Sequence, residues 1–101
     1  MAVTDNTDDT GTAQIAIIHL THLTERLREH GLRVRVASRR PPKLAVDNPD
    51  APALSENVHA APEEGTWWFW WSWNEKIAPV AEADDAARRI RHVLTPAVRS
   101  R

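Results

Sequence analysis

Apolar residues recur at helical spacing in the first third of the chain. Four of them follow one another at intervals of four, three and four residues: Ala16, Leu20, Leu23 and Leu27. This stripe is typical of one face of an amphipathic helix. Thr12 is a residue type that caps helix N-termini, and Gly31 suits the left-handed position that follows a helix. We therefore predict a helix from about residue 13 to about residue 30.

The apolar period then changes to two. Residues 32–36 alternate leucine and valine with Arg33 and Arg35, which predicts a half-buried strand with a basic outward face. Pro41-Pro42 breaks this pattern, because proline cannot donate to a strand ladder. A shorter alternation over residues 43–47 predicts a second strand.

Residues 48–65 combine small side chains with three prolines: Pro49, Pro52 and Pro62. We predict a long loop here, because prolines disfavour the interior of a sheet. Leu54 and Val58 indicate that part of this loop contacts the core or forms a short edge strand.

All five tryptophans and the only phenylalanine lie in one run, Trp67-Trp68-Phe69-Trp70-Trp71-Ser72-Trp73. Aromatic residues favour pleated, packed surfaces, and Gly65 and Asn74 bracket the run. We therefore predict a strand over residues 66–74.

A second helical stripe follows Pro79, a residue type that suits the first turn of a helix. Acidic residues gather near its start and basic residues near its end, which matches the helix dipole. We predict that Pro96 ends the helix. Its apolar face consists of Ala83, Ala86, Ala87, Ile90, Val93 and Leu94.

These elements predict an α+β domain with the order α-β-β-(β)-β-α. Both helices would pack on one face of an antiparallel sheet of three to four strands. A length of 101 residues fits one domain. We expect residues 1–11 to form a disordered acidic tail, residues 12–96 the domain and residues 97–101 a basic tail.

Side chains of a strand point alternately to its two faces. The larger aromatic set, which we assign to the core beneath the helices, is Trp67, Phe69, Trp71 and Trp73. Trp68 and Trp70 then lie on the face away from the helices. The alternation alone also allows the reverse assignment.

Leaving two indoles in water gives up several kcal/mol of stabilisation, because each Å² of buried apolar surface contributes about 25 cal/mol. Such exposed apolar patches mark interaction surfaces. We therefore expect a small non-catalytic interaction or regulatory protein that forms a homodimer around a two-fold axis. Trp68 and Trp70 would anchor the interface, with Arg33 and Arg35 as contacts at its rim.

The sequence also allows other contacts for this aromatic face. The 48–65 loop could fold over it, or the face and the loop together could enclose a sugar or another small molecule. A single-stranded nucleic acid could stack on the tryptophans beside the nearby basic residues. We consider nucleic acid the less favoured ligand, because four carboxylates near the tryptophans repel phosphate: Glu56, Glu63, Glu64 and Glu75.

The formal net charge of −1 conceals opposed segments. Residues 25–43 contribute +5 and residues 44–74 contribute −5, a layout that favours self-association or a charged protein partner. The acidic N-terminus does not resemble a signal peptide, and no apolar run reaches the roughly 20 residues of a membrane span. We expect a cytoplasmic protein without membrane contact.

Candidate catalytic chemistry is sparse. The chain has no cysteine and only three glycines, so it offers neither a thiol nucleophile nor a glycine-rich phosphate loop. His19 and His22 share a helix face as metal ligands can, but no further ligand of an obvious kind completes the set. We predict no catalytic residues, no metal and no cofactor.

Two resemblances follow from these residues. The order α-β-β-β-α is similar to that of the double-stranded-RNA-binding domain, but Glu82, Asp84 and Asp85 stand where that family carries phosphate-binding lysines. The run Trp67–Trp73, the segment 74–79 and the alanine-rich helix to Leu94 resemble small uncharacterised proteins of high-GC bacteria. The second resemblance implies a bacterial setting and no particular activity.

Overall fold

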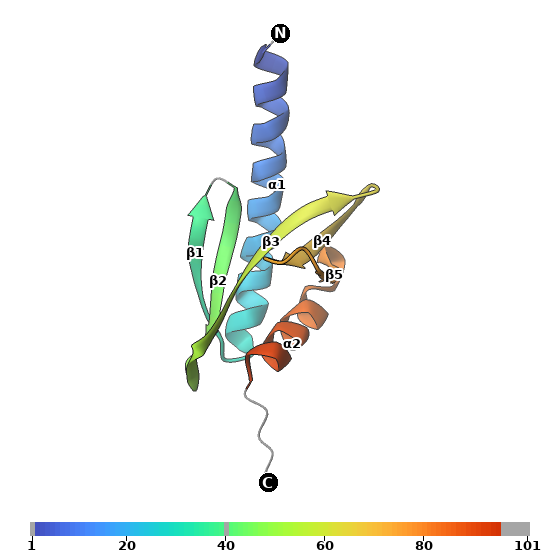
Figure 1. The fold of residues 1–101 in the computed structure, drawn as a ribbon. Helices are drawn as coiled ribbons and strands as arrows, with labels where there is room; N and C mark the ends of the chain where they lie inside the picture. The colour runs from blue at the N-terminus through green and yellow to red at the C-terminus, as the bar shows by residue number, and fades with distance from the viewer. Residues whose placement is uncertain (1, 40, 96–101) are drawn as a thin grey trace.

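The computed structural model describes residues 2–39 and 41–95 (Figure 1). The fold is α+β, as predicted, but the antiparallel sheet has five strands rather than three to four. The elements are α1 (Ala2–Glu29), β1 (Arg33–Arg39), β2 (Pro42–Asn48), β3 (Ala51–Glu63), β4 (Thr66–Trp71), β5 (Lys76–Pro79), the 3-10 helix η1 (Val80–Glu82) and α2 (Ala83–Leu94).

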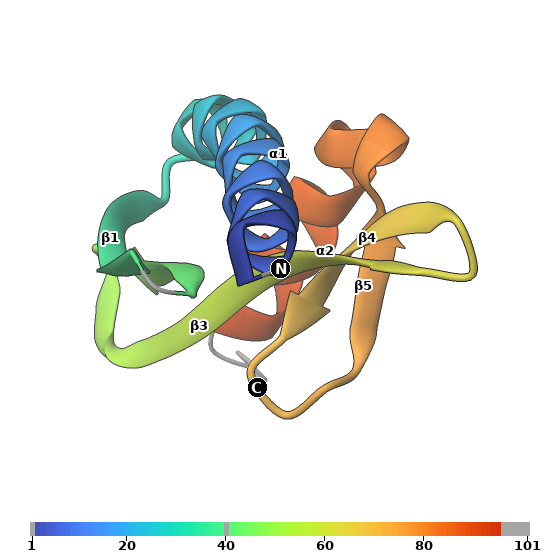
Figure 2. The same cartoon turned by 90° about the horizontal axis from the view of Figure 1, so that it is seen from above.

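The strands lie in sequence order, β1-β2-β3-β4-β5, and each pairs antiparallel with the next. The prediction of a loop over residues 48–65 is wrong, because β3 occupies most of this stretch and forms the centre of the sheet (Figure 2). Pro52 and Pro62 lie near the two ends of β3, where proline is tolerated. Between them, β3 pairs with both of its neighbours.

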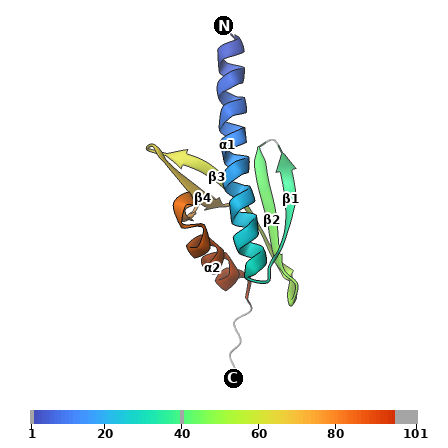
Figure 3. The same ribbon diagram turned by 180° about the vertical axis from the view of Figure 1, so that it is seen from behind.

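Both helices cover the same face of the sheet and contact each other (Figure 3). The predicted stripe of α1 is buried in the core, together with Leu44 and Val46 of β2. Val58, Ala60 and Phe69 continue this core across β3 and β4. Val36 is exposed instead of buried, because β1 is an edge strand whose pairing shifts between Val36 and Ser38.

Helix α1 begins at Ala2, so it includes Thr12 and the stretch 2–11 that we expected to be a disordered tail. The stretch contains no proline, and its acidic residues suit the N-terminal end of a helix dipole. The N-terminal half of α1 extends beyond the sheet (Figure 1). The predicted basic tail, residues 97–101, lies outside the described residues.

The end of α1 confirms the role predicted for Gly31, whose φ is 84°. The Gly31 N–H donates to the Arg28 carbonyl at 3.0 Å, and the Leu32 N–H donates to the Leu27 carbonyl at 3.1 Å. This pair of bonds is the Schellman motif. Leu27 and Leu32 are both buried, so the motif turns the chain from α1 into β1 while it holds both leucines in the core.

The second helix starts later than predicted. Pro79 ends β5, and η1 separates it from Ala83, where α2 begins. The predicted apolar face of α2 is buried except for Val93, which is exposed.

The β3–β4 hairpin turns on two residues that both have positive φ, Glu64 at 52° and Gly65 at 81°. This geometry is that of a type I′ turn, whose preferred sequence is Asn-Gly. Glutamate is disfavoured there because its Cβ crowds the backbone in the left-handed region. We expect Glu64→Asn to raise the free energy of unfolding by about 0.5–1 kcal/mol.

Urea denaturation of the variant measures this gain. Glu64→Gln is the matched control, since it removes the same charge without the asparagine preference for this conformation. Equal stabilisation by both variants would assign the effect to charge and contradict the conformational explanation.

Candidate interaction surface

The strand pairings define the face of the sheet that points away from the helices. His59 pairs with Trp70, Ala61 pairs with Trp68, and Trp70 also pairs with Lys76 of β5. These residues alternate with the buried residues of β3 and β4, so they point to the opposite side. We call this side the outer face.

Trp68 and Trp70 lie on the outer face, as predicted, and each is half-buried. Their cover comes from neighbours on the same face. The Lys76 ammonium lies 4.5 Å from the centroid of the Trp68 ring and 5.8 Å from that of Trp70. The His59 ring is parallel to Trp70 within 8°, with centroids 6.2 Å apart. The Trp70 Nε1–H donates to the Ala61 carbonyl at 3.1 Å.

Lys76 also forms an ion pair with Glu63 at the end of β3. One ammonium group therefore contacts a carboxylate and two indole faces, which fixes its position over the tryptophans. A cation above an indole is attracted by about 0.5–2 kcal/mol. Sequence reasoning missed Lys76 and His59, because their placement depends on strand pairings that the sequence pattern did not reveal.

His59 is half-buried on the outer face, and it follows Val58, which pairs with Leu44 next to Lys43. Burial lowers the pKa of His59 below its ordinary value, and the positive charge of Lys43 lowers this pKa further. The imidazole is therefore neutral at neutral pH and stacks as an uncharged ring.

Arg33 and Arg35 lie on the outer face but not beside the tryptophans. We expected them to be on a strand next to the tryptophan strand, whereas β2 and β3 separate β1 from β4. Three strand spacings correspond to about 14 Å. Arg33 donates from Nε and Nη2 to Asp47 Oδ2, at 3.0 Å and 2.6 Å. Arg35 is exposed and has no hydrogen bond or ion pair with any other described residue.

Three of the four aromatic residues assigned to the core pack there. Phe69 is fully buried and Trp71 is 5% exposed. Trp67 is half-buried against the core, and its ring lies 5.2 Å from that of His19 on α1. The pKa of His19 is lowered by burial and, to a lesser extent, by nearby His22.

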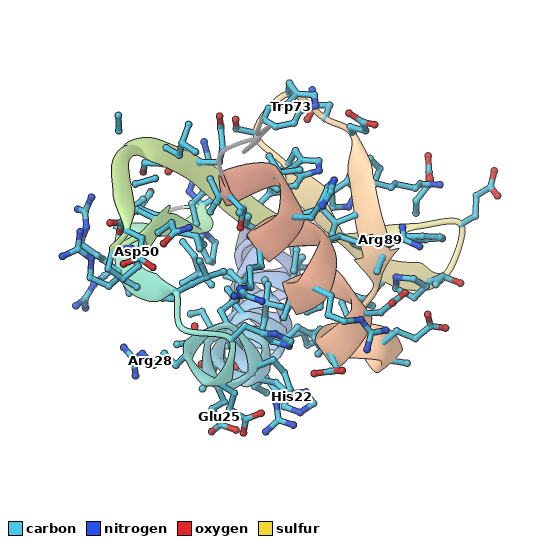
Figure 4. All side chains as sticks on the ribbon, turned by 90° about the horizontal axis from the view of Figure 1, so that it is seen from below. His22, Glu25, Arg28, Asp50, Trp73 and Arg89 are labelled. Atoms are coloured by element: carbon cyan, nitrogen blue, oxygen red, sulfur yellow. The ribbon has the colours of Figure 1, made fainter. Side chains whose placement is uncertain are left out.

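Trp73 is not a core residue, since it is 49% exposed. Strand β4 ends at Trp71, and the following turn, which includes Asn74 at a φ of 65°, ends the alternation. The Trp73 ring stacks on Trp71 at 4.9 Å, and its Nε1–H donates to Glu75 Oε1 at 2.7 Å. Figure 4 shows Trp73 at the periphery of the molecule.

Three of the four carboxylates that we expected to repel phosphate either have a partner within the chain or lie on the other face of the sheet. Glu63 pairs with Lys76 and Glu75 accepts the Trp73 bond. Glu56 pairs with Val46 across the strands, which places it on the helix-facing side. Residues 48–65 also cannot form a lid over the tryptophans, because β3 lies within the sheet itself.

Charge is distributed unevenly over the outer face. Arg35 and Lys43 lie toward its β1–β2 side. On the tryptophan side, Glu63 is paired with Lys76, and Glu64 lies in the turn between β3 and β4. The β1–β2 side of the face is therefore the more basic one.

Other site chemistry is limited in the part of the chain that the structure describes. No group of three or more histidine or acidic side chains there could hold a metal ion. Among the same residues, no helix is long and apolar enough to cross a membrane.

Comparisons with protein-family models, with curated proteins and with solved structures find no match to this chain.

Proposed function

We propose that this protein is a small non-catalytic interaction domain that self-associates through its outer face. The observation that carries the proposal is the pair Trp68 and Trp70, which are half-exposed on a sheet face that no other described element covers. A second copy would remove the remaining indole surface from water. Partly exposed aromatic residues of this kind are the usual anchors of protein interfaces.

The charge distribution supports one arrangement of the two copies. A two-fold axis that runs along β3, between two sheets facing each other, brings the β1–β2 side of each copy over the β4–β5 side of its partner. The side of one copy that carries Arg35 and Lys43 then faces the tryptophan side of the other, where a cation over an indole is attracted by about 0.5–2 kcal/mol. Such complementarity favours the correct orientation of the partners.

The position of Lys76 also favours this interface. Its ammonium already has a carboxylate partner and two aromatic faces within its own chain. Burying it against a second sheet would therefore not leave an unpaired charge, which is the costly case at an interface.

We expect the protein to be a dimer at micromolar concentration and the double variant Trp68→Ala/Trp70→Ala to be a monomer. Loss of two anchors should raise the dimer dissociation constant roughly thirtyfold or more. Sedimentation equilibrium measures the constant, and circular dichroism checks that the variant is folded. Trp73→Ala is the matched control, because Trp73 is exposed but lies beyond the outer face. A monomeric parent protein, or equal constants for all variants, contradicts the proposal.

A second candidate function is binding of a single-stranded nucleic acid. It is favoured by the cross-strand row His59-Trp70-Lys76 with Lys43 near His59, which combines two cations with two parallel rings. Stacking on aromatic rings next to cations is how such ligands are held. In the same sedimentation experiment, a monomer that binds an oligothymidylate in a salt-sensitive manner would favour this candidate over the dimer.

A further inference from the structure

A groove of about 1000 Å³ lies between the middle of α1 and the sheet. It is located beside Pro42, the first residue of β2, where β3 extends beyond its pairing with β2. The β1–β2 turn forms one wall, α1 forms another, and the β4–β5 turn closes the far side. The groove adjoins the outer face at Lys43, His59 and Ala61, but Trp68 and Trp70 are not among the described residues that line it.

Alanines explain why this part of the molecule is hollow. In the C-terminal half of α1, the leucines of the helical stripe fill the space between the helix and the sheet. The same stripe continues toward the N-terminus as Ala16, with Ala13 one turn earlier. Opposite them, β3 presents Ala60, which lies on the side of the sheet that faces the helices. Methyl groups on both sides leave an apolar gap that leucine side chains would close.

The rim of the groove is basic. Arg39 and Lys43 lie on the wall formed by the β1–β2 turn. Neither has a hydrogen bond or ion pair with another residue in the described ranges 2–39 and 41–95. The described lining contains no carboxylate. The groove thus combines an apolar floor with two uncompensated positive charges at one side.

We propose that this groove binds one molecule of a long-chain carboxylate. The hydrocarbon chain would lie over Ala13, Ala16 and Ile17, and the carboxylate would contact Arg39 and Lys43. The half-exposed side chain of Ile17 supplies further apolar surface along the chain. Ligand sites of this kind are mostly apolar, with a few polar groups that fix the orientation. The volume of the groove is at the upper end of the range for small-molecule sites.

Calorimetric titration with decanoate, below the concentration at which it aggregates, tests the proposal. We expect saturable binding of one decanoate per chain. Decanol should bind roughly tenfold more weakly, and Arg39→Gln and Lys43→Gln should each weaken decanoate binding by a similar factor, because each change removes a charge-assisted contact. Both substitutions are at the surface, so folding should be unaffected.

Ala13→Leu tests the location of the site, because the larger side chain fills the groove and should abolish saturable binding. Ala81→Leu is the matched control, since Ala81 is exposed on η1 and outside the groove. Absence of saturable binding to the parent protein overturns the proposal. So does equal binding of decanol, binding that persists in Ala13→Leu, or binding to anionic vesicles without binding to monomeric decanoate.

Discussion

Replacing Phe69 with alanine should lower the free energy of unfolding by about 3–5 kcal/mol. Phe69 is fully buried and lies near the middle of the core, where it pairs with Ala60 on β3 and Ala78 on β5. Both neighbours are alanines, so no larger side chain is present on either flanking strand to fill the cavity. A loss of this size is a large fraction of the 5–15 kcal/mol that stabilises a typical small domain.

Urea denaturation followed by circular dichroism measures the loss. Phe69→Leu keeps most of the volume and should cost less than about 1.5 kcal/mol. If the alanine variant were no less stable than the leucine variant, Phe69 would not be the central core residue that its burial indicates.

Asn48→Ala should cost about 2–3 kcal/mol, because it removes two hydrogen bonds, one of them buried. Asn48 Nδ2 donates to the Leu94 carbonyl at 3.1 Å, and Asn48 Oδ1 accepts the Asp50 N–H at 2.9 Å. The Leu94 carbonyl is at the C-terminal end of α2, where carbonyls have no partner within the helix. One side chain therefore shapes the β2–β3 turn and attaches the end of α2 to the sheet.

Thermal and urea unfolding of Asn48→Ala test this assignment. Asn57→Ala is the control, because Asn57 is exposed on the neighbouring strand β3. Equal stability of the two variants would show that the contact between Asn48 and Leu94 contributes little to the fold.

Periodicity alone predicted the parts of the fold in which one face is buried. The leucine stripe of α1, the alternation around Leu44 and Val46, and the alanine face of α2 all lie in the core. In these segments burial imposes a repeat of about 3.6 or 2 residues on the sequence, so the repeat reveals the element. The same alternation groups Phe69 with Trp71, and the larger size of their aromatic set assigns both to the core.

The central strand could not be predicted in this way. Its prolines indicate a loop when they are considered alone, and only the pairing of β3 with β2 and β4 shows that they lie near the strand ends. The misplacement of Trp73 has a similar cause, because the point at which β4 turns depends on the hairpin with β5. Strand order and register are long-range properties that local patterns do not determine.

Sequence reasoning predicted only the part of the candidate interaction surface that lies on a single strand, β4. Alternation divides the tryptophan run into two sets, and Trp68 and Trp70 were placed on the outer face because theirs is the smaller set. Lys76, His59 and Glu63 join them only through the pairings of β4 with β5 and β3. The pairings of β2 with β1 and β3 place Arg33 and Arg35 at the opposite edge of the outer face from the tryptophans. Contacts with Lys76 and Trp73 engage Glu63 and Glu75, two of the carboxylates that were expected to repel phosphate.

The contact between the first and last helices has a consequence for how the chain folds during synthesis. The five strands form a continuous meander from neighbouring segments, so hairpins can pair as soon as they emerge from the ribosome. Helix α2, the last described element, completes the core beside α1. Until translation passes Leu94, the nascent chain therefore exposes Phe69 and the leucines of α1, and this interval is when binding by a chaperone would have its greatest effect.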